Sequence, residues 1–341
     1  MKITDLTAPT PTQDVIPVRK QFANSDLPFY RPLGRTNLMV SCLGLGGGGQ
    51  ISSEDTLYAF DQGINFFFYS SDLHHYLYSS MAGALRQLCG RKSAVREQVV
   101  LATVSYIVKT PEAIFSSLYD QFVDLGIDYI DIFFWGWIGA DNAGDLQNCL
   151  SASNDLRGSN TVCQRTMERI FGTSERLKKM GAVRYIGASF HDHHLARQWL
   201  NNPLLDVVMV RHNVAHRTAQ QEVFAKLDPH DSRRSGIVTF KSAGMHNFLG
   251  DPPVGLPPGC WRPKVPDLYR YSLSQNCVDV CLTGLTRREE VDAAIANVQQ
   301  GKLSATELDY LALYGDLHRN RVKVQDVPAE RWYQPTLAAA L

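Results

Sequence analysis

Short runs of β-branched and aromatic residues alternate along this chain with longer stretches whose apolar residues recur at helical spacing. Eight runs have the length and composition of strands: Val40–Leu45, Asn65–Tyr69, Val99–Val104, Tyr129–Phe134, Arg184–Ala188, Val207–Val210, Ile237–Phe240 and Val278–Leu282. Helical patterns lie between them: Ser53–Asp61, Pro111–Leu125, Gln164–Met180, His194–Leu200, Ala219–Leu227 and Arg288–Gln299. Strands that alternate with helices pair in parallel through right-handed crossovers. The pattern therefore predicts an α/β fold, a single (β/α)8 TIM barrel.

The two ends of the chain show neither periodicity. Residues 1–28 are rich in Thr and Pro and predict an irregular N-terminal arm, followed by the barrel over 29–320 and a C-terminal tail over 321–341. Two connections, Gly139–Asn160 and the Pro-rich Gly250–Pro266, are longer than a barrel needs. Both follow strand carboxyl ends, where barrel enzymes build their active sites, so they are candidate substrate-covering loops. Surface insertions are the alternative.

Composition excludes several classes of protein. Lys plus Arg and Asp plus Glu both number 34, so no net field attracts nucleic acid. Seven cysteines without a CxxC pair fit buried thiols in a reducing compartment, which predicts a cytoplasmic protein. Neither a signal peptide nor a long apolar run predicts contact with a membrane. The expected partner is a small molecule, and the oligomeric state stays open.

Seven segments, in order and spacing, resemble the aldo/keto reductase superfamily over roughly residues 30–315. They are RPLGRTNLMVSCLGLGGG, GINFF, DLGIDYIDIFF, KKMGAVRYIGASFH, RHN, TFKSAG and VCLTGLTRREEVDAAIANV. The resemblance implies a TIM barrel and a tetrad of Asp, Tyr, Lys and His, in which the Tyr protonates a carbonyl. Alignment of these segments places Phe68, Val104 and Gly136 at the Asp, Lys and His, while Tyr76 and Tyr78 compete for the Tyr. We therefore expect a degenerate tetrad.

The resemblance also implies a nicotinamide pocket, and this pocket has changed. Ser189 is followed by Phe rather than Asn, and Met209 and His212 fall near the amide-binding Gln and the ring-stacking Tyr. At the phosphate end the sequence is closer to the family, with three cofactor-binding candidates: Gly284, Arg287 and Arg288. Solvated charges at a helix start are an equal alternative. NADP is thus a possible cofactor whose binding stays open.

Polar residues gather after the predicted carboxyl ends of four strands. Among them are Asp72, His74, His75, Tyr76, Tyr78, Ser189, His191, Asp192, His193, His194, Arg211, His212, Asn213, His216, Lys241, Ser242 and His246. A His beside an Asp is a natural acid/base pair. We predict catalytic roles for five residues: His212, Asp72, His75, Tyr76 and Lys241. His212 ranks first because it lies just past a strand. For any single histidine, packing is the alternative.

Two tryptophans, Trp135 and Trp137, flank Gly136 at the end of the fourth strand. They predict a cavity with aromatic walls, suited to a flat or aromatic substrate. The predicted substrate-binding residues are Trp135, Trp137, His74, Tyr78, His191, Arg211, Asn213 and Trp261. The HDHH run at 191–194 resembles no zinc signature, and a helix-start role for Asp192 explains it, so no metal is expected.

Three functions remain open. The first is an enzyme that has moved to acid/base chemistry on a small organic molecule, such as elimination, isomerisation or cyclisation. The second is a nicotinamide-dependent oxidoreductase with a relocated proton donor. The third is a non-catalytic barrel that binds a ligand or a partner.

Overall fold

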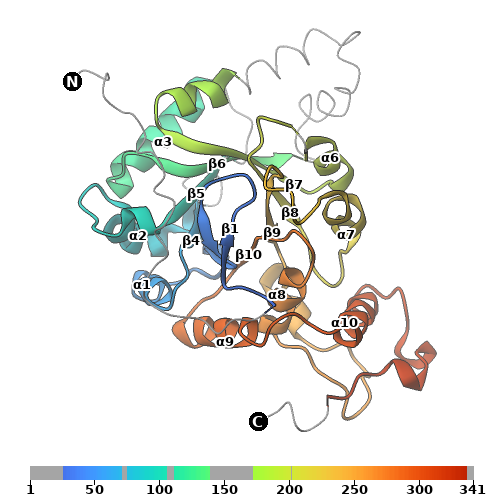
Figure 1. The fold of residues 1–341 in the computed structure, drawn as a ribbon. Coiled ribbons are helices and arrows are strands. Elements are labelled where there is room, and N and C mark those ends of the chain that lie inside the picture. Colours follow the sequence, from blue (N-terminus) through green and yellow to red (C-terminus); the bar gives the residue numbers. More distant parts are fainter. Residues whose placement is uncertain (1–25, 71–74, 106–110, 139–171, 201, 336–341) are drawn as a thin grey trace, which may run out of the picture.

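Eight parallel strands close into a barrel, which confirms the predicted fold (Figure 1). The structure is a computed structural model that describes residues 26–70, 75–105, 111–138, 172–200 and 202–335. In barrel order the strands are β10 (Val280–Thr283), β3 (Leu43–Gly46), β4 (Phe66–Tyr69), β5 (Val100–Ser105), β6 (Ile130–Ile138), β7 (Val183–Phe190), β8 (Val207–Arg211) and β9 (Gly236–Phe240). Each pairs in parallel with both neighbours.

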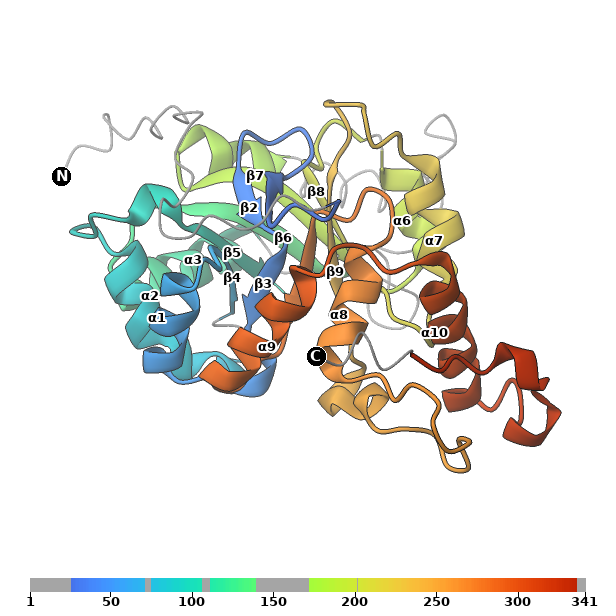
Figure 2. The same ribbon diagram turned by 60° about the horizontal axis from the view of Figure 1, so that its bottom comes forward.

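Helices enclose the strands on the outside (Figures 1 and 2). They are α1 (Ser53–Asp61), α2 (Ala82–Cys89), α3 (Pro111–Leu125), α6 (His193–Trp199), α7 (Thr218–Glu222), α8 (Val265–Leu273), α9 (Arg288–Val298) and α10 (Ala305–His318). Residues 172–179 form a further helix, the described part of the pattern predicted at 164–180. Side chains cap several helices: Ser52 accepts a hydrogen bond at the start of α1, and Ser304 and Glu307 form a capping box at α10. None of the described helices is long and apolar enough to cross a membrane.

The run predicted as one strand at Val40–Leu45 is in fact two strands, so this prediction is wrong. β1 (Tyr30–Pro32) and β2 (Met39–Ser41) form an antiparallel hairpin, and the chain turns at Cys42 into β3. A continuous apolar run carries no sign of that turn. The hairpin covers the amino-terminal end of the barrel (Figure 2). There Leu33 packs so closely on Gly236 that a Cβ on the glycine would lie 2.7 Å from it.

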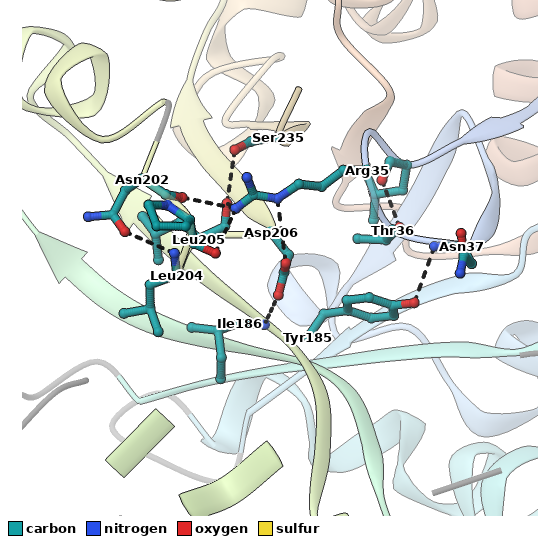
Figure 3. Close-up of polar contacts among 12 residues, drawn as sticks. Arg35, Thr36, Asn37, Tyr185, Ile186, Asn202, Leu204, Leu205, Asp206 and Ser235 are labelled. Atoms are coloured by element: carbon teal, nitrogen blue, oxygen red, sulfur yellow. Dashed lines mark hydrogen bonds and ion pairs between the residues drawn. The ribbon is translucent and has the colours of Figure 1, made fainter. Parts of the chain in front are cut away.

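Arg35 fastens the hairpin to the barrel (Figure 3). Its guanidinium donates hydrogen bonds to the carbonyls of Asn202, Pro203 and Leu205 and lies 3.5 Å from the carboxylate of Asp206. Hydrogen bonds to a charged group are stronger than neutral ones. The amino-terminal end is therefore closed, and the carboxyl-terminal end is left for a site.

Alternation along the strands separates the barrel interior from the helix layer. A Cβ on Gly44 would contact Phe66 and Leu282, and one on Gly187 would contact the ring of Phe134. These side chains therefore point into the barrel. The residues between them point to the helices, as Thr103 does when it donates a hydrogen bond to Gln121 of α3.

The described cysteines are free and buried. They are Cys42, Cys89, Cys260, Cys277 and Cys281. Burial raises the pKa of the Cys42 thiol to about 11 and that of Cys89 to about 12. These thiols stay protonated and behave as small apolar side chains.

Candidate functional site

An apolar floor lies at the carboxyl-terminal end of the barrel. The buried side chains of Phe68 and Phe134 lie with ring centroids 6.1 Å apart, and Val104 is the register partner of Phe134. Gly136 follows on the same side of β6, where a Cβ would lie 2.5 Å from both the Ser105 carbonyl oxygen and Cγ2 of Val104. Phe68, Val104 and Gly136 therefore lie together, and the backbone around Gly136 leaves no room for a side chain.

One of the two candidate tyrosines joins this floor. Tyr78 is buried, with its ring centroid 6.0 Å from Phe68 and 6.2 Å from Tyr69. Tyr76 and His75 are exposed, with ring centroids 6.3 Å apart. Two further predicted site residues, Asp72 and His74, lie outside the described residues. Of this predicted group, the structure brings Tyr78 to the floor.

Three cationic side chains, here called the rim cations, lie around the ends of β8 and β9: Arg211, Lys241 and Arg319. Arg211 ends β8 on the inward side and pairs with Phe240 across the strands. Lys241 follows β9, with Nζ 5.9 Å from the centroid of the Phe240 ring. Arg319 follows α10. Within the described residues no carboxylate lies within ion-pair distance of a rim cation.

The pKa values of Arg211 and Lys241 are both lowered in this part of the structure. Burial lowers the pKa of Arg211, and the charge of Arg319 lowers it further. Burial, followed by the charge of Arg211, likewise lowers the pKa of Lys241. Both shifts favour the neutral forms. For Lys241 a lowered pKa means a larger fraction of free amine at a given pH than an exposed lysine has.

The backbone of Lys241 is held in a specific conformation. Its φ angle is 57°, in the left-handed region that a non-glycine residue rarely adopts. The Lys241 carbonyl accepts hydrogen bonds from Nδ2 of Asn213, at 2.8 Å, and from the N–H of Gly244, at 3.0 Å. Asn213 also accepts two backbone N–H groups of the turn after β8. Asn213 therefore links the end of β8 to the end of β9 by hydrogen bonds, and this link fixes the backbone that carries Lys241.

His216 positions Arg319. Nη1 of Arg319 donates to Nε2 of His216 at 2.6 Å, so this ring nitrogen carries no proton. The other ring nitrogen, Nδ1, lies 3.2 Å from Oδ1 of Asn213 and donates to it. Burial and the neighbouring arginines, Arg211 before Arg319, lower the pKa of His216 to about 4. A neutral histidine of fixed tautomer thus holds the arginine.

The structure places His212 away from the mouth, which contradicts its predicted first rank among the catalytic residues. Its fully buried ring stacks on Tyr271 of α8 at 5.6 Å and meets Phe224 edge-on. Nδ1 lies 2.9 Å from Oγ of Ser272. Burial, helped by the charges of His193 and Arg217, lowers the pKa of His212 to about 3. Alternation explains the error, because a residue two positions beyond the outward Val210 also points outward.

Trp135 also points into the helix layer, so its predicted place in a cavity wall is wrong. Nε1 of Trp135 donates to Oγ of Ser174 in the helix at 172–179, and the side chain is buried. Its neighbour Phe133 points the same way. Trp137 belongs to the same strand, and its side chain lies outside the described part of the structure. The inward residue here is Gly136.

The HDHH run begins α6. Oδ1 of Asp192 accepts the N–H groups of His194 and Leu195, which confirms the predicted helix-start role. His193 is buried with Nε2 2.8 Å from the carbonyl of Arg211. His191 lies nearer the mouth, its ring centroid 5.3 Å from Phe240. Among the residues that the structure describes, no group of three His, Cys, Asp or Glu side chains is arranged to hold a metal.

More than half of the chain matches the sequence model of one family. That model describes the aldo/keto reductase family and matches residues 51–239. The chain belongs to the aldo/keto reductase family. No curated protein matches it in sequence.

Solved aldo-keto reductases share this fold. AKR11C1 from Bacillus halodurans in its holo form is 18% identical, with a TM-score of 0.59 and a match over 89% of this chain and 99% of that one. The apo form is 17% identical, with a TM-score of 0.55 and coverage of 89% and 99%. A Pseudomonas aeruginosa protein assigned to the aldo-keto reductases is 17% identical, with a TM-score of 0.55 and coverage of 82% and 97%. At this identity the likeness shows the fold alone.

The nicotinamide pocket implied by the aldo/keto reductase resemblance would lie between β7 and β8. Ser189 and Met209, two predicted cofactor residues, are register partners there and both are buried. A thioether cannot both donate and accept the hydrogen bonds of a carboxamide. This end of the pocket therefore fits a nicotinamide poorly.

The predicted phosphate end also differs from what the aldo/keto reductase resemblance implies. Arg288 is paired with Glu54 at 2.6 Å and with Asp55 at 2.9 Å. Arg287 lies 3.4 Å from Glu290. Gly284 begins the loop after β10, beside the backbone of Gly48 and Gly49. Since both arginines already contact carboxylates, a phosphate here would have to compete with acidic side chains.

Trp261 lies outside the mouth. Its ring stacks on Tyr310 of α10 at 5.9 Å and meets Tyr333 edge-on at 5.6 Å, and its backbone N–H donates to the Tyr333 carbonyl. The loop Gly250–Pro266 thus packs on α10 and on the segment after it, and the loop Gly139–Asn160 lies outside the described residues.

Arg319 is the site residue that sequence reasoning missed, because no strand pattern connects it with Arg211.

Proposed function

We propose that this aldo/keto reductase family member acts on a small organic molecule by acid/base chemistry, as in an elimination, isomerisation or cyclisation. The observation that carries the proposal is the apolar floor: Phe68, Val104 and Gly136 align with the family's Asp, Lys and His. A side chain at residue 136 would collide with the Ser105 carbonyl. Val104 stands where the family has the Lys that lowers the pKa of the phenol, so this route to an effective tyrosine acid near neutral pH is lost.

Lys241 is the base in this proposal. Its lowered pKa increases the fraction of free amine, which can take a proton from a carbon next to a carbonyl. Arg211, on the adjacent strand, is placed to stabilise the negative charge that then develops on the carbonyl oxygen. The proton that leaves the carbon ends on Nζ of Lys241. Each of the three named reaction types can begin with this step.

Two measurements test the proposal. The purified chain is expected to oxidise NADPH negligibly in the presence of simple aldehydes. Rapid reduction of the aldehydes would refute the proposal and favour an oxidoreductase with a relocated proton donor. In D2O, the chain is expected to catalyse exchange of the acidic C–H protons of small ketones and 2-oxo acids, followed by NMR. Lys241→Met should lower the exchange rate about 10²–10⁴-fold. The matched control is Lys226→Met, at an exposed lysine far from the mouth.

A fluorescence titration with NADPH and NADH tests the cofactor directly. Because Met209 and the paired Arg288 fit the cofactor poorly, we expect weak binding of both and no preference for NADPH. Tight binding of NADPH would favour an oxidoreductase with a relocated proton donor. Absence of both proton exchange and reduction would leave a barrel that binds a ligand without turnover.

A further inference from the structure

The rim cations are unusual because their charge is not compensated within the described residues. Three other half-buried arginines of the barrel contact carboxylates: Arg35 with Asp206, Arg184 with Asp131, and Arg234 with Asp279. The buried Arg270 contacts none, but its guanidinium donates to backbone carbonyls and to Gln300. The carboxylate nearest to the rim in sequence, Asp316, is already bound by Arg217 and Arg321 at 2.9 and 3.0 Å. No described acidic group is left to neutralise the rim.

Arg211 also has donor groups that nothing in the described residues uses. Its Nε is buried and has no hydrogen-bond partner, whereas buried polar atoms are almost always hydrogen-bonded. The side chain belongs to the inward set of β8 and is half-buried. A guanidinium with an unused edge is the group that binds carboxylates and phosphates in a bidentate manner.

We infer that the two arginines of the rim cations hold the oxyanion of an organic substrate, a carboxylate or a phosphate. Arg211 supplies the fork and Arg319 is held beside it by His216, while Lys241, at the adjacent strand end, lies close enough to act as the base on the bound molecule. The apolar body of the substrate then lies over Phe240, which pairs with Arg211 and lies under Lys241. The inference names the substrate class for the proposed function, and binding itself does not require the acid/base step.

The first test measures anion binding without turnover. Thermal unfolding of the full chain is followed with benzoate, phenyl phosphate, inorganic phosphate and neutral benzamide, each compared with sodium chloride at equal ionic strength. A ligand that binds the folded state raises the melting temperature by mass action. We expect benzoate or phenyl phosphate to raise it in a saturable way, and benzamide to leave it unchanged. The better of the two aromatic anions identifies the oxyanion.

The second test assigns the effect to the rim. Arg211→Gln should weaken the binding of the stabilising anion by about 10- to 100-fold, because a charge-assisted hydrogen-bond pair is lost. Arg319→Gln should weaken it less, since that side chain is exposed. The control is Arg233→Gln, at an exposed arginine paired with Asp231 far from the mouth. Because no carboxylate of the described residues pairs with Arg211, the variant is expected to fold.

Each outcome decides the inference. Equal stabilisation by benzamide and benzoate, no saturable stabilisation by either aromatic anion, or unchanged anion affinity in both Arg211→Gln and Arg319→Gln overturns it. Should anion binding fail while Lys241-dependent proton exchange persists, the inference is wrong and the proposed function stands. Should anion binding follow Arg211 without any proton exchange, the site is real and the proposed function falls.

Discussion

The two ends of the barrel treat charge in opposite ways. At the amino-terminal end, buried Asp131 accepts hydrogen bonds from Arg96 at 2.9 Å and from Arg184 at 2.8 Å. At the carboxyl-terminal end, Arg211 and Lys241 face each other's charge with no described carboxylate between them. Paired charges hold strands in register. Unpaired charges that repel each other lower the free energy of unfolding, and a bound anion would raise it again. The amino-terminal end is therefore built for stability, and the carboxyl-terminal end carries the charges of the proposed anion site.

Breaking the paired end should have the largest effect. Asp131→Asn leaves two arginines without their shared counter-ion in a fully buried setting. Removal of one partner of such a pair destabilises by about 3–5 kcal/mol. Urea unfolding should show this loss, while the affinity for anions at the rim stays unchanged. The control is Asp128→Asn, whose exposed pair with Arg91 should change stability by less than about 1 kcal/mol.

The next effect is a pH dependence of the unfolding free energy that comes from His212. Its pKa is about 3 in the fold and 6.5 in the unfolded chain, so below pH 6.5 the unfolded state binds the extra proton. Stability then falls with decreasing pH, by about 1.4 kcal/mol per pH unit between roughly pH 6 and 4. The groups around the ring are Ser272, Tyr271, Phe224 and the more distant charges of His193 and Arg217.

This slope is measurable as a difference between variants. In His212→Gln, urea unfolding at pH 6, 5 and 4 should show the unfolding free energy declining less steeply than in the parent. His194→Gln, at an exposed histidine, serves as the control. Identical slopes in the parent and in His212→Gln would show that the ring is accessible to protons, and would return His212 to the list of candidate acids and bases.

A smaller effect sharpens the assignment of the apolar floor. Gly136→Ala places a methyl group 2.5 Å from a backbone oxygen and from Val104, and such overpacking costs about 1–3 kcal/mol. Gly48→Ala is the matched control, because nothing lies within 4 Å of its added Cβ. Urea unfolding of both variants measures the difference. If Gly136→Ala leaves the unfolding free energy unchanged, the end of β6 can shift to make room for a side chain. A larger residue at the position aligned with the family's His would then be compatible with the fold.

The smallest effect comes from the rim itself. Without ligand, Arg211→Gln removes a repelling charge and leaves no carboxylate unpaired among the described residues. Its unfolding free energy should stay within about 0.5 kcal/mol of the parent or rise slightly. A fall of more than about 2 kcal/mol would reveal an acidic partner and would erase the contrast between the two ends.

Local signals in the sequence predict much of the fold. The predicted bounds of the helices at Ser53–Asp61 and Pro111–Leu125 agree with α1 and α3 to the residue, because capping residues and a leading proline mark helix starts. The hairpin was not predicted, since the turn at Cys42 lies inside a continuous apolar run. Period two along β6 also sends Trp135 to the helices, a constraint that a simple reading of flanking tryptophans overlooks.

The candidate site was harder to predict than the fold. Lys241 and Arg211 follow from their position at strand ends, but the ring of His212 has its direction fixed by Tyr271 and Ser272, which lie 59 and 60 residues further along the chain. Arg319 depends on where α10 packs, and strand periodicity says nothing about that. Long-range packing of this kind is absent from local sequence patterns.

The position of Arg319 in the chain separates the charge of the rim from the packing of the barrel. This rim cation follows α10, a helix that comes after the last strand–helix unit of the barrel, and its exposed side chain is held by one contact to His216. A substitution there changes the charge of the proposed anion site without disturbing the packed core. The affinity of that site can therefore be adjusted from a helix outside the eight strand–helix units, independently of the barrel that carries Arg211 and Lys241.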